Sequence, residues 1–443
     1  MMRKDATEKL VIQGGNPISG TVIPSGSKNE ALPVLASTLL ASEPVILRNI
    51  PKIQDVLVML DVLERIGSKV EQLEKGEYRI DTTGVDTWRL PAELCSKIRA
   101  SILFAGPMLA RMGKVELPPP GGDVIGRRRL DTHFDGMLEM GADLMMGNSY
   151  VLQTKDGEGL TGADLYLDEA SVTATENLLM AAAQAKNETI IRNAACEPHV
   201  QGLANILNKM GANIEGIGTN MLKIQGADHL GGADHTIGTD YLEVGSFIIL
   251  AAVTGGHLRI KNVNKQDVRI VLKNFSKIGI STYWEDETTL VVPDNQDLKV
   301  QYELHGSIPQ IDDSPWPQFP TDMMSMAIVA ATQSTGTMLF FEKMFEGRMY
   351  FVDNLISMGA RIIPCDPHRI VVAGPSKLYG SQLESPDVRA GMALLTAALC
   401  AEGRSDIHNV RQIDRGYERI DERLRELGAD IERVKLQVSQ EEV

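Results

Sequence analysis

Cysteine is scarce in this sequence, and apolar runs of membrane-spanning length are absent from it. The four cysteines among the 443 residues (Cys95, Cys196, Cys365 and Cys400) do not have the spacing of metal ligands. We therefore expect reduced thiols and no metal site. Gly, Ser, Thr or a charged residue interrupts every apolar run, and the first fifteen residues lack the apolar core of a signal peptide. These absences predict a cytoplasmic protein without membrane insertion.

A surplus of basic residues is also missing. The net charge of −15 argues against a nucleic-acid partner, because such proteins normally carry a basic stripe. It does not exclude a small anionic substrate, since the local field of a cleft can oppose the net charge. With 43% hydrophobic and 23% charged residues, the chain has an ordinary globular composition. Its length predicts the core of two or three domains.

One unit recurs six times along the chain. In each copy a short strand precedes an amphipathic helix that ends at a glycine, and a second strand follows. We expect each glycine to adopt the left-handed conformation that ends a helix. The six glycines are Gly67, Gly141, Gly211, Gly279, Gly359 and Gly428.

A second kind of helix, nearly apolar all round, lies between the units. Such a helix must be buried on all sides. Each carries a polar or charged residue near its start, and a helix N-terminus attracts anions. These residues are Lys28 with Asn29, Arg99, Glu176, Glu243, Asp322 and Arg389. We expect the helix starts to emerge at a shared surface, although ordinary caps and first-turn charges would give the same pattern, above all at Glu176 and Glu243.

The stretch Glu116–His133, ELPPPGGDVIGRRRLDTH, differs from the rest of the chain. Three prolines exclude a helix interior or a central strand, and two glycines allow unusual backbone conformations. A loop here would present Asp123 together with three consecutive arginines. Taken alone, the stretch is more typical of an ordinary solvated loop. We call it the lid loop.

Six motifs, in order and at matching spacing, resemble the UDP-N-acetylglucosamine 1-carboxyvinyltransferase family across nearly the whole chain. They are PSGSKNEALPVLA, KIRASILFAGP, PGGDVIGRRRLDTH, FPTDMMS, FEGRM and IDRGYERI. The 3-phosphoshikimate 1-carboxyvinyltransferases share the six-unit plan, but their shikimate-recognition motifs are not seen. The resemblance implies an α/β fold, a two-domain inside-out α/β barrel with three units per domain and the substrates in the cleft between domains.

Domain size favours three units per domain. We predict a first domain over residues 24–236, which carries the lid loop 116–133, and a second over 1–23 and 237–443. The strand EKLVIQGG near the N-terminus should complete a sheet of the second domain. The polar end after Val434 should be frayed.

The resemblance implies a reaction without a cofactor. Phosphoenolpyruvate would donate its enolpyruvyl group to the 3′-hydroxyl of UDP-N-acetylglucosamine, through a tetrahedral phospho-ketal, as the first committed step of peptidoglycan synthesis. Such anionic substrates need fixed cations, and arginine suits phosphate and carboxylate best. By motif, Lys28, Arg128 and Arg415 would hold phosphoenolpyruvate, with Arg348 and Arg389 beside them. The nucleotide sugar would meet Asn29, Arg99, Arg128, Arg129, Leu130, Asp131, Thr132, Glu169, Ala170, Ser171, Val172, Asp322 and Met344.

The two proton transfers that this reaction requires are assigned to two carboxylates. Asp322 is the expected base or hydroxyl orienter. Asp123 stands where most members carry the cysteine that acts as general acid and that fosfomycin alkylates, so we expect insensitivity to fosfomycin. Three further departures are a lid loop two residues longer, Glu169 where many members have Lys, and Gln412 where many have His.

Two other functions stay open on the sequence. Glu169 allows an enolpyruvyl transferase that acts on a different nucleotide acceptor. A non-catalytic paralogue that binds UDP-sugars is also possible, although such a protein has no need of the base Asp322. Surface ion pairing is the plain alternative for Lys28, Arg99 and Arg415. The sequence does not settle the oligomeric state.

Overall fold

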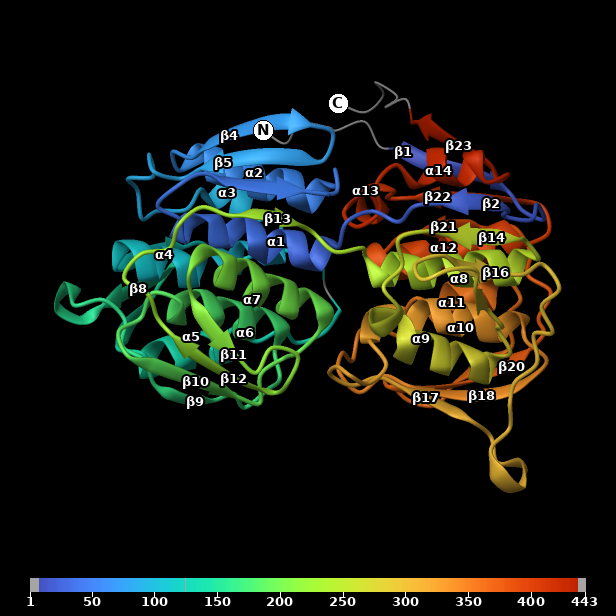
Figure 1. Cartoon of the computed structure of the whole chain (residues 1–443). Coiled ribbons are helices and arrows are strands. Elements are labelled where there is room, and N and C mark those ends of the chain that lie inside the picture. Colours follow the sequence, from blue (N-terminus) through green and yellow to red (C-terminus); the bar gives the residue numbers. More distant parts are fainter. Residues whose placement is uncertain (1–7, 124, 437–443) are drawn as a thin grey trace, which may run out of the picture. The chain divides into compact units, whose positions relative to one another are not determined.

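The computed structural model describes residues 8–123 and 125–436, which divide into two compact units (Figure 1). Unit 1 comprises residues 8–24, 123, 125–127 and 239–436, and unit 2 comprises Ser25–Gly122 and Arg128–Gly238. The sequence placed the whole lid loop in the first domain, whereas Asp123 and the residues up to Arg127 group with unit 1. The polar end predicted to fray lies mainly outside the described residues, but Lys435 still belongs to a strand.

Each unit contains three copies of the predicted repeat. A first strand leads into an amphipathic helix, and the two strands that follow form an antiparallel hairpin whose last strand pairs with the first. In unit 2 the copies are β3 (Val45–Arg48), α2 (Gln54–Arg65), β4 (Lys69–Glu74) and β5 (Glu77–Asp81); β6 (Lys114–Leu117), α5 (Asp131–Glu139), β7 (Ala142–Met146) and β8 (Tyr150–Thr154); and β10 (Glu188–Arg192), α7 (Pro198–Met210), β11 (Asn213–Glu215) and β12 (Met221–Gln225).

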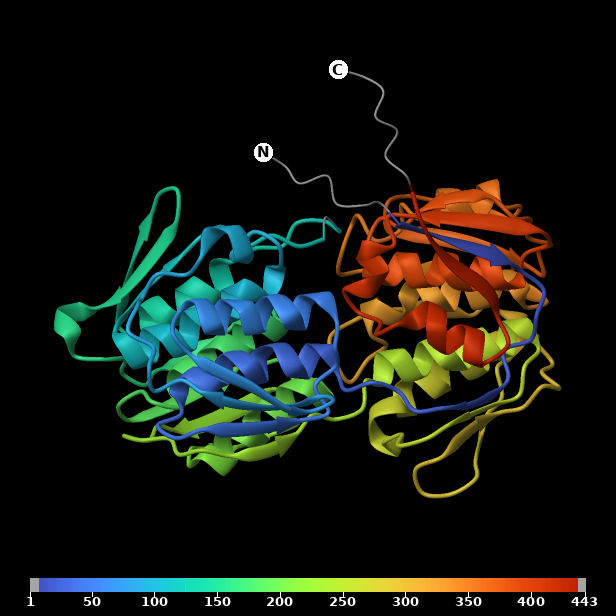
Figure 2. The same cartoon turned by 90° about the horizontal axis from the view of Figure 1, so that it is seen from above.

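In unit 1 the third copy takes its last strand from the other end of the chain. The copies are β14 (Leu258–Ile260), α9 (Lys265–Ile278), β15 (Tyr283–Trp284) and β16 (Leu290–Val292); β18 (Gly336–Phe341), α11 (Val352–Ser357), β19 (Ile362–Pro364) and β20 (Arg369–Gly374); and β22 (Arg404–His408), α14 (Ile420–Glu426), β23 (Asp430–Lys435) and β1 (Glu8–Gln13). Strand β1 pairs antiparallel with both β22 and β23, which confirms the strand predicted near the N-terminus (Figure 2).

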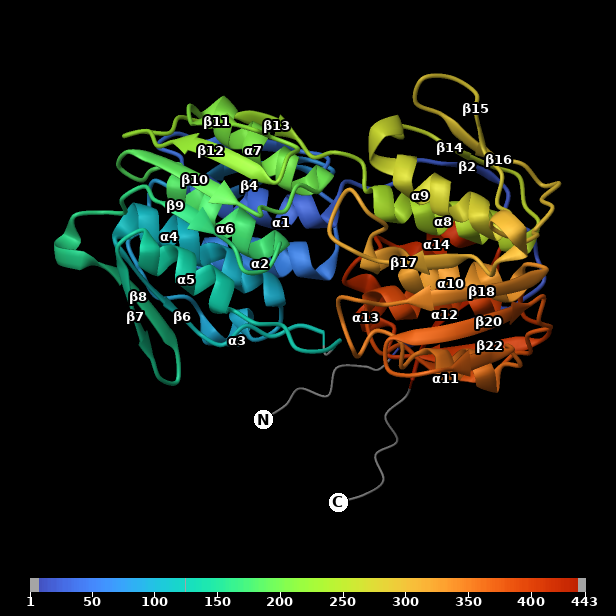
Figure 3. The same ribbon diagram turned by 90° about the horizontal axis from the view of Figure 1, so that it is seen from below.

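Five of the six sheets gain a parallel edge strand that leads into a buried helix. The edge strands are β2 (Gly20–Val22), β9 (Asp164–Tyr166), β13 (Asp234–Thr236), β17 (Gln310–Asp312) and β21 (Gln382–Glu384). The sheet of β6, β7 and β8 has only a single parallel bridge, between Arg89 and Glu116, in that place (Figure 3). The lid loop therefore belongs to the copy with the smallest sheet.

The buried helices form the core of each unit, as their apolar composition predicts. They are α1 (Lys28–Ser37), α4 (Ala105–Met112) and α6 (Val172–Ala182) in unit 2, and α8 (Tyr241–Thr254), α10 (Met324–Gln333) and α12 (Val388–Cys400) in unit 1. Within each unit the three helices pack against one another. The sheets surround them, which gives the inside-out α/β arrangement expected from the resemblance.

Three apolar segments are not single α-helices, contrary to the sequence prediction. A 3-10 turn follows α1 (Thr38–Leu40), and others precede α4 (Arg99–Phe104) and α10 (Thr321–Met323). Short helices α3 (Ala92–Cys95) and α13 (Arg411–Asp414) complete the secondary structure, with 3-10 turns at Lys155–Gly157 and Leu304–Gly306. No helix in the described ranges is both long enough and apolar enough to cross a membrane.

All six repeat glycines end their helices with positive φ, between 95° and 113°, as predicted. A side chain at these positions is strained by the backbone alone. At Gly279 a Cβ atom would also lie 2.3 Å from the backbone nitrogen of Lys299. Gly403, which precedes β22 in the same unit, has φ +90° but open space around it.

We therefore expect Gly279→Ala to lower the free energy of unfolding more than Gly403→Ala does. The control should lose about 1–2 kcal/mol from backbone strain, and Gly279→Ala should lose that amount and more because Lys299 must move. Urea unfolding followed by circular dichroism measures both. Equal losses of unfolding free energy in the two variants would show that the segment around Lys299 moves without cost.

Candidate active site

In unit 2, hydrogen bonds join three stretches that the sequence singles out. The guanidinium of Arg99, at the start of the turn before α4, donates to the carbonyls of Arg128 (2.6 Å) and Arg129 (3.2 Å). Arg129 in turn pairs with Asp168, whose second oxygen accepts from the hydroxyl of Thr132 at 2.8 Å. Burial and the charge of Arg128 lower the pKa of Arg99 to about 10, so the group stays protonated at neutral pH.

Asp168 directly precedes the stretch Glu169–Val172. Ser171 caps α6 by accepting from the amide of Ala174, and the amide of Ser171 donates to the carbonyl of Glu169 at 2.7 Å. Ala170 and Val172 are half-buried, whereas Glu169 is exposed. Leu130 and Asp131 begin α5, and Asp131 lies 3.3 Å from Arg129. Residues 128–132 and 169–172 thus form one surface of unit 2.

A buried histidine connects the two helices that carry this surface. His133 is 1% exposed, and its ring contacts Thr173 through Nε2 (3.1 Å) and Asn177 through Nδ1 (3.0 Å). These contacts tie α5 to α6. Burial, assisted by the charge of Arg99, lowers the pKa of His133 to about 3, so the ring is neutral.

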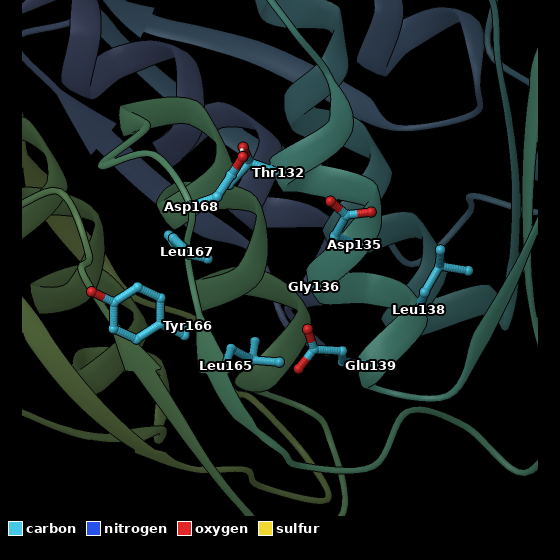
Figure 4. Close-up of a pocket in the computed structure, with 9 residues that line it drawn as sticks. All are labelled: Thr132, Asp135, Gly136, Leu138, Glu139, Leu165, Tyr166, Leu167 and Asp168. Carbon is cyan, nitrogen blue, oxygen red and sulfur yellow. Dashed lines mark hydrogen bonds between the residues drawn. The ribbon is translucent and has the colours of Figure 1, made fainter.

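A pocket of about 380 Å³ lies beside this surface, between α5 and β9. Thr132 and Asp168 meet at one end of it, and Asp135 and Glu139 project from α5 (Figure 4). Its lining carries three carboxylates and no basic side chain, so the pocket disfavours a phosphate group.

Lys28 and Asn29 lie in the first turn of α1, outside the network of Arg99 and Asp168. The ammonium of Lys28 is 2.8 Å from the carboxylate of Asp55 on α2, and both side chains are largely buried. The cap of α1 is Ser27, which accepts from the amide of Glu30. Lys28 is therefore a fixed cation at the start of a buried helix.

In unit 1, Asp322 is held by two buried arginines. One carboxylate oxygen lies 2.9 Å from Nη2 of Arg348, and the other lies 3.1 Å from Nε of Arg389. The two arginines are 4% and 5% exposed. Asp322 begins the turn before α10 and Arg389 lies in the first turn of α12, so the pairing joins two helix starts.

Arg389 keeps its charge although it is fully enclosed. Burial acts to lower its pKa, but Asp322 and Tyr417 outweigh burial and hold the pKa above its ordinary value. The hydroxyl of Tyr417 lies 3.3 Å from Nη1 of Arg389. The amide of Arg389 donates to Asp387, the cap of α12. A charge this well paired is a permanent part of the site.

Arg415, which follows α13, pairs with the lid residue Asp123. The same guanidinium nitrogen donates to Oε1 of Gln412 at 3.0 Å, and the ion pair with Asp123 is largely buried. The neighbouring segment is held by backbone bonds, from Gly347 to Ile125 (2.9 Å) and from Arg127 to the side chain of Glu346 (3.0 Å). These two bonds attach residues 125–127 to the loop 343–348, which carries Met344 and Arg348.

The structure adds residues that the sequence did not single out. Asp55, Asp168, His133, Asn177 and Glu342 hold the predicted residues in place. Glu342 accepts from the amide of Met344 at 3.1 Å. A comparison of the six first strands finds one of them, because Glu342 stands where four copies have asparagine. The other four residues have no feature in the surrounding sequence that singles them out.

The described residues hold no group of three or more His, Cys, Asp or Glu side chains arranged for a metal ion. All four cysteines are free thiols, with Cys95 and Cys196 buried and Cys365 exposed. Burial raises the pKa of Cys95 and of Cys400 to about 12 in each case. Neither is a reactive thiolate.

The neutral His133 predicts a pH dependence. Its folded pKa of about 3 lies below the ordinary value of 6.5, so its contribution to stability is complete above pH 6.5 and is lost as the pH falls toward 3. Between pH 6.5 and 5 the wild type should lose about 2 kcal/mol more unfolding free energy than His133→Gln. Urea unfolding at several pH values measures the difference. His229→Gln, at an exposed position, should keep the wild-type slope, and equal slopes for all three proteins would contradict the assignment.

Comparison with known proteins identifies the family of this chain. The family model described as EPSP synthase (3-phosphoshikimate 1-carboxyvinyltransferase) matches residues 12–424. A UDP-N-acetylglucosamine 1-carboxyvinyltransferase of Treponema denticola is 56% identical over 425 residues, which cover 96% of this chain and 99% of the relative. A protein of the same name from Bradyrhizobium diazoefficiens is 52% identical over 426 residues, with coverage of 96% and 98%.

Solved structures share the fold. An enolpyruvyl transferase from Streptomyces tendae superposes with a TM-score of 0.86 at 24% identity, over 98% of this chain and 100% of that one. EPSP synthase from Acinetobacter baumannii gives 0.75 at 18% identity, over 97% and 100%. The resemblance carried by the six motifs is confirmed at the level of the family. The chain belongs to the carboxyvinyl (enolpyruvyl) transferases, the family that the EPSP synthase model describes and that includes the UDP-N-acetylglucosamine 1-carboxyvinyltransferases.

Proposed function

We propose that this enzyme transfers the enolpyruvyl group of phosphoenolpyruvate to the 3′-hydroxyl of UDP-N-acetylglucosamine and releases phosphate. The observation that carries the proposal is the pairing of Asp322 with Arg348 and Arg389, a carboxylate fixed between two buried cations. Relatives at 56% and 52% identity over nearly the whole chain carry the name of this activity. The reaction is the first committed step of peptidoglycan synthesis.

Phosphoenolpyruvate is assigned to a set of fixed cations, of which Arg128 also belongs to the nucleotide surface. Lys28, Arg128 and Arg415 receive its phosphate and carboxylate, with Arg348 and Arg389 supplying further positive charge. Each is held by an internal partner, such as Asp55 for Lys28. Cations held in this way need little reorganisation when a substrate anion arrives.

The nucleotide sugar is assigned to residues 128–132 and 169–172 of unit 2, together with Asn29 and Arg99. The carbonyl groups of Arg128 and Arg129 accept from Arg99, which fixes the backbone of this stretch. Glu169 is exposed at the end of this surface. A carboxylate there disfavours close approach of a phosphate and favours contact with hydroxyl groups of the ligand.

Proton transfer is assigned to two carboxylates. Asp322 accepts the proton of the sugar hydroxyl as the C–O bond to phosphoenolpyruvate forms, and the methylene carbon takes up a proton from Asp123. In the elimination, Asp123 takes back a proton from the methyl group as the C–O bond to phosphate breaks, and Asp322 passes its proton to the leaving phosphate, which restores the double bond. In the free enzyme Asp123 pairs with Arg415. The phosphate of the substrate replaces it there, and the freed carboxylate, now beside an anion, takes up the proton that it later donates.

Phosphate release from phosphoenolpyruvate, with and without UDP-N-acetylglucosamine, tests the proposed function. We expect release only with the sugar nucleotide, and a loss of at least about 100-fold in kcat for Lys28→Ala and Arg415→Ala, because each removes a charge at the reacting anion. Arg411→Ala, an exposed position on α13, should keep wild-type turnover. Release with a different nucleotide acceptor alone would favour the alternative acceptor, and no release with any acceptor would favour a binding paralogue.

Asp123 predicts a response to fosfomycin. The wild type should remain active in its presence, since a carboxylate is a poor nucleophile for the epoxide. Asp123→Cys should gain time-dependent inactivation, and Asp123→Ala should lose most turnover because alanine delivers no proton. Cys365, the exposed thiol, is replaced by Ser in parallel so that any inactivation is assigned to position 123. Inactivation of the wild type, or full turnover by Asp123→Ala, would contradict the assignment.

A further inference from the structure

The residue after the first strand of each repeat has a recurring structural role. In four copies it is an asparagine with φ between 56° and 58°, namely Asn49, Asn193, Asn262 and Asn409. The amides of three of them donate at 2.9 Å to the carbonyl of Ile237, Leu167 or Ser385, each just after the parallel edge strand. The asparagine therefore fastens the loop after the first strand to its neighbour in the sheet.

Two copies depart from this pattern. The copy with the lid loop has Pro118 in this position, and the copy that carries Arg348 has Glu342. Glu342 is completely buried and does not adopt a left-handed conformation. Its place at the end of β18 puts a carboxyl group, in place of an amide, beneath the loop 343–348.

The carboxyl group of Glu342 accepts hydrogen bonds from three donors. Its oxygens accept from the hydroxyl of Thr321 (2.9 and 3.2 Å), from the amide of Met344 (3.1 Å) and from the amide of Phe345 (2.9 Å). Thr321 is the residue before Asp322, and Phe345 lies against the guanidinium of Arg348, 5.5 Å from its ring centre. One buried side chain thus holds both sides of the Asp322–Arg348 pair.

A second buried carboxyl completes the arrangement. Asp313 follows the edge strand β17, is fully buried, and accepts from the amide of Lys343 at 2.6 Å. Burial, the hydrogen bond with Asp313 and the charge of Asp313 raise the pKa of Glu342 to about 8, against the opposing charge of Arg348. The other titratable group nearby is His368, whose ring contacts the carbonyl of Glu342. The raised pKa favours the protonated form of Glu342 at neutral pH.

We propose that Glu342 is a positioning residue of the active site, which sets Asp322 against Arg348 by holding Thr321 and the amides of Met344 and Phe345. The inference rests on the proposed function insofar as Asp322 acts on the substrate. Asparagine in the other copies satisfies a single carbonyl. Glu342 instead accepts from three donors, which belong to two separate segments of the chain.

The test compares Glu342→Gln, Glu342→Ala and Asn262→Ala. Glutamine keeps an acceptor for the two amides, so kcat should stay within about fivefold of the wild type. Alanine releases the loop, and a displacement of about 1 Å at the base costs on the order of 100-fold in kcat. Asn262→Ala places an alanine at the corresponding left-handed position of another copy in unit 1, so backbone strain should lower the melting temperature but leave kcat within about twofold.

A readout independent of turnover separates this inference from the proposed function. Hydrogen exchange of the Met344 and Phe345 amides should be slow in the wild type and Glu342→Gln, and faster by at least about tenfold in Glu342→Ala. If the wild type releases no phosphate but the three proteins show this exchange pattern, the proposed function is wrong and the structural role of Glu342 stands. Continued slow exchange in Glu342→Ala would overturn the inference, as would a folded Glu342→Ala variant with wild-type kcat.

Thr321→Val provides a second variant if Glu342→Ala does not fold. It removes only the hydroxyl that bonds to Glu342 and keeps the shape of the side chain. We expect kcat to fall by at least about fivefold, with KM for phosphoenolpyruvate changed by less than about twofold and the melting temperature within a few degrees of the wild type. Unchanged kcat in Thr321→Val would overturn the inference.

Discussion

A helix that is apolar on every side can present polar atoms only at its ends. The six buried helices of this chain obey that constraint, and three of them fill the centre of each unit. Functional side chains therefore gather where these helices begin, as Lys28 does at α1 and Arg389 at α12. The surrounding sheets are needed to bury the rest of each helix, so the repeat architecture and the location of the site follow from one requirement.

Within each unit, the cations singled out as candidate substrate ligands are paired internally. Arg389 and Arg348 share Asp322, Lys28 has Asp55, and Arg415 has Asp123. An arginine buried without a partner would be costly, because the charge is removed from water. The partners differ in where they are attached. Asp55 and Asp322 are built into helical segments, whereas Asp123 lies on a loop rich in glycine and proline.

The sequence predicted the features that depend on local chemistry. The glycines that end helices and the strand near the N-terminus require only a backbone conformation or a short pattern, and both are confirmed. Pairings across the fold were not predictable in this way. Asp123 and Arg415 are 292 positions apart, and Asp168 reaches Arg129 over 39. The 3-10 turns before α4 and α10 were missed because apolar composition indicates burial but does not distinguish tight turns from α-helix.

The position of β1 has a consequence for biosynthesis. This strand lies between β22 and β23, and Lys9 contacts Asp406, 397 residues later. Ribosomes add about 5–20 residues per second, so β1 waits roughly 20–80 s after its own synthesis before its neighbours exist. Meanwhile nearly all of unit 2 has been made from a continuous stretch. The nascent chain therefore carries β1 without its partner strands for most of its time on the ribosome, with the edges of that strand unpaired.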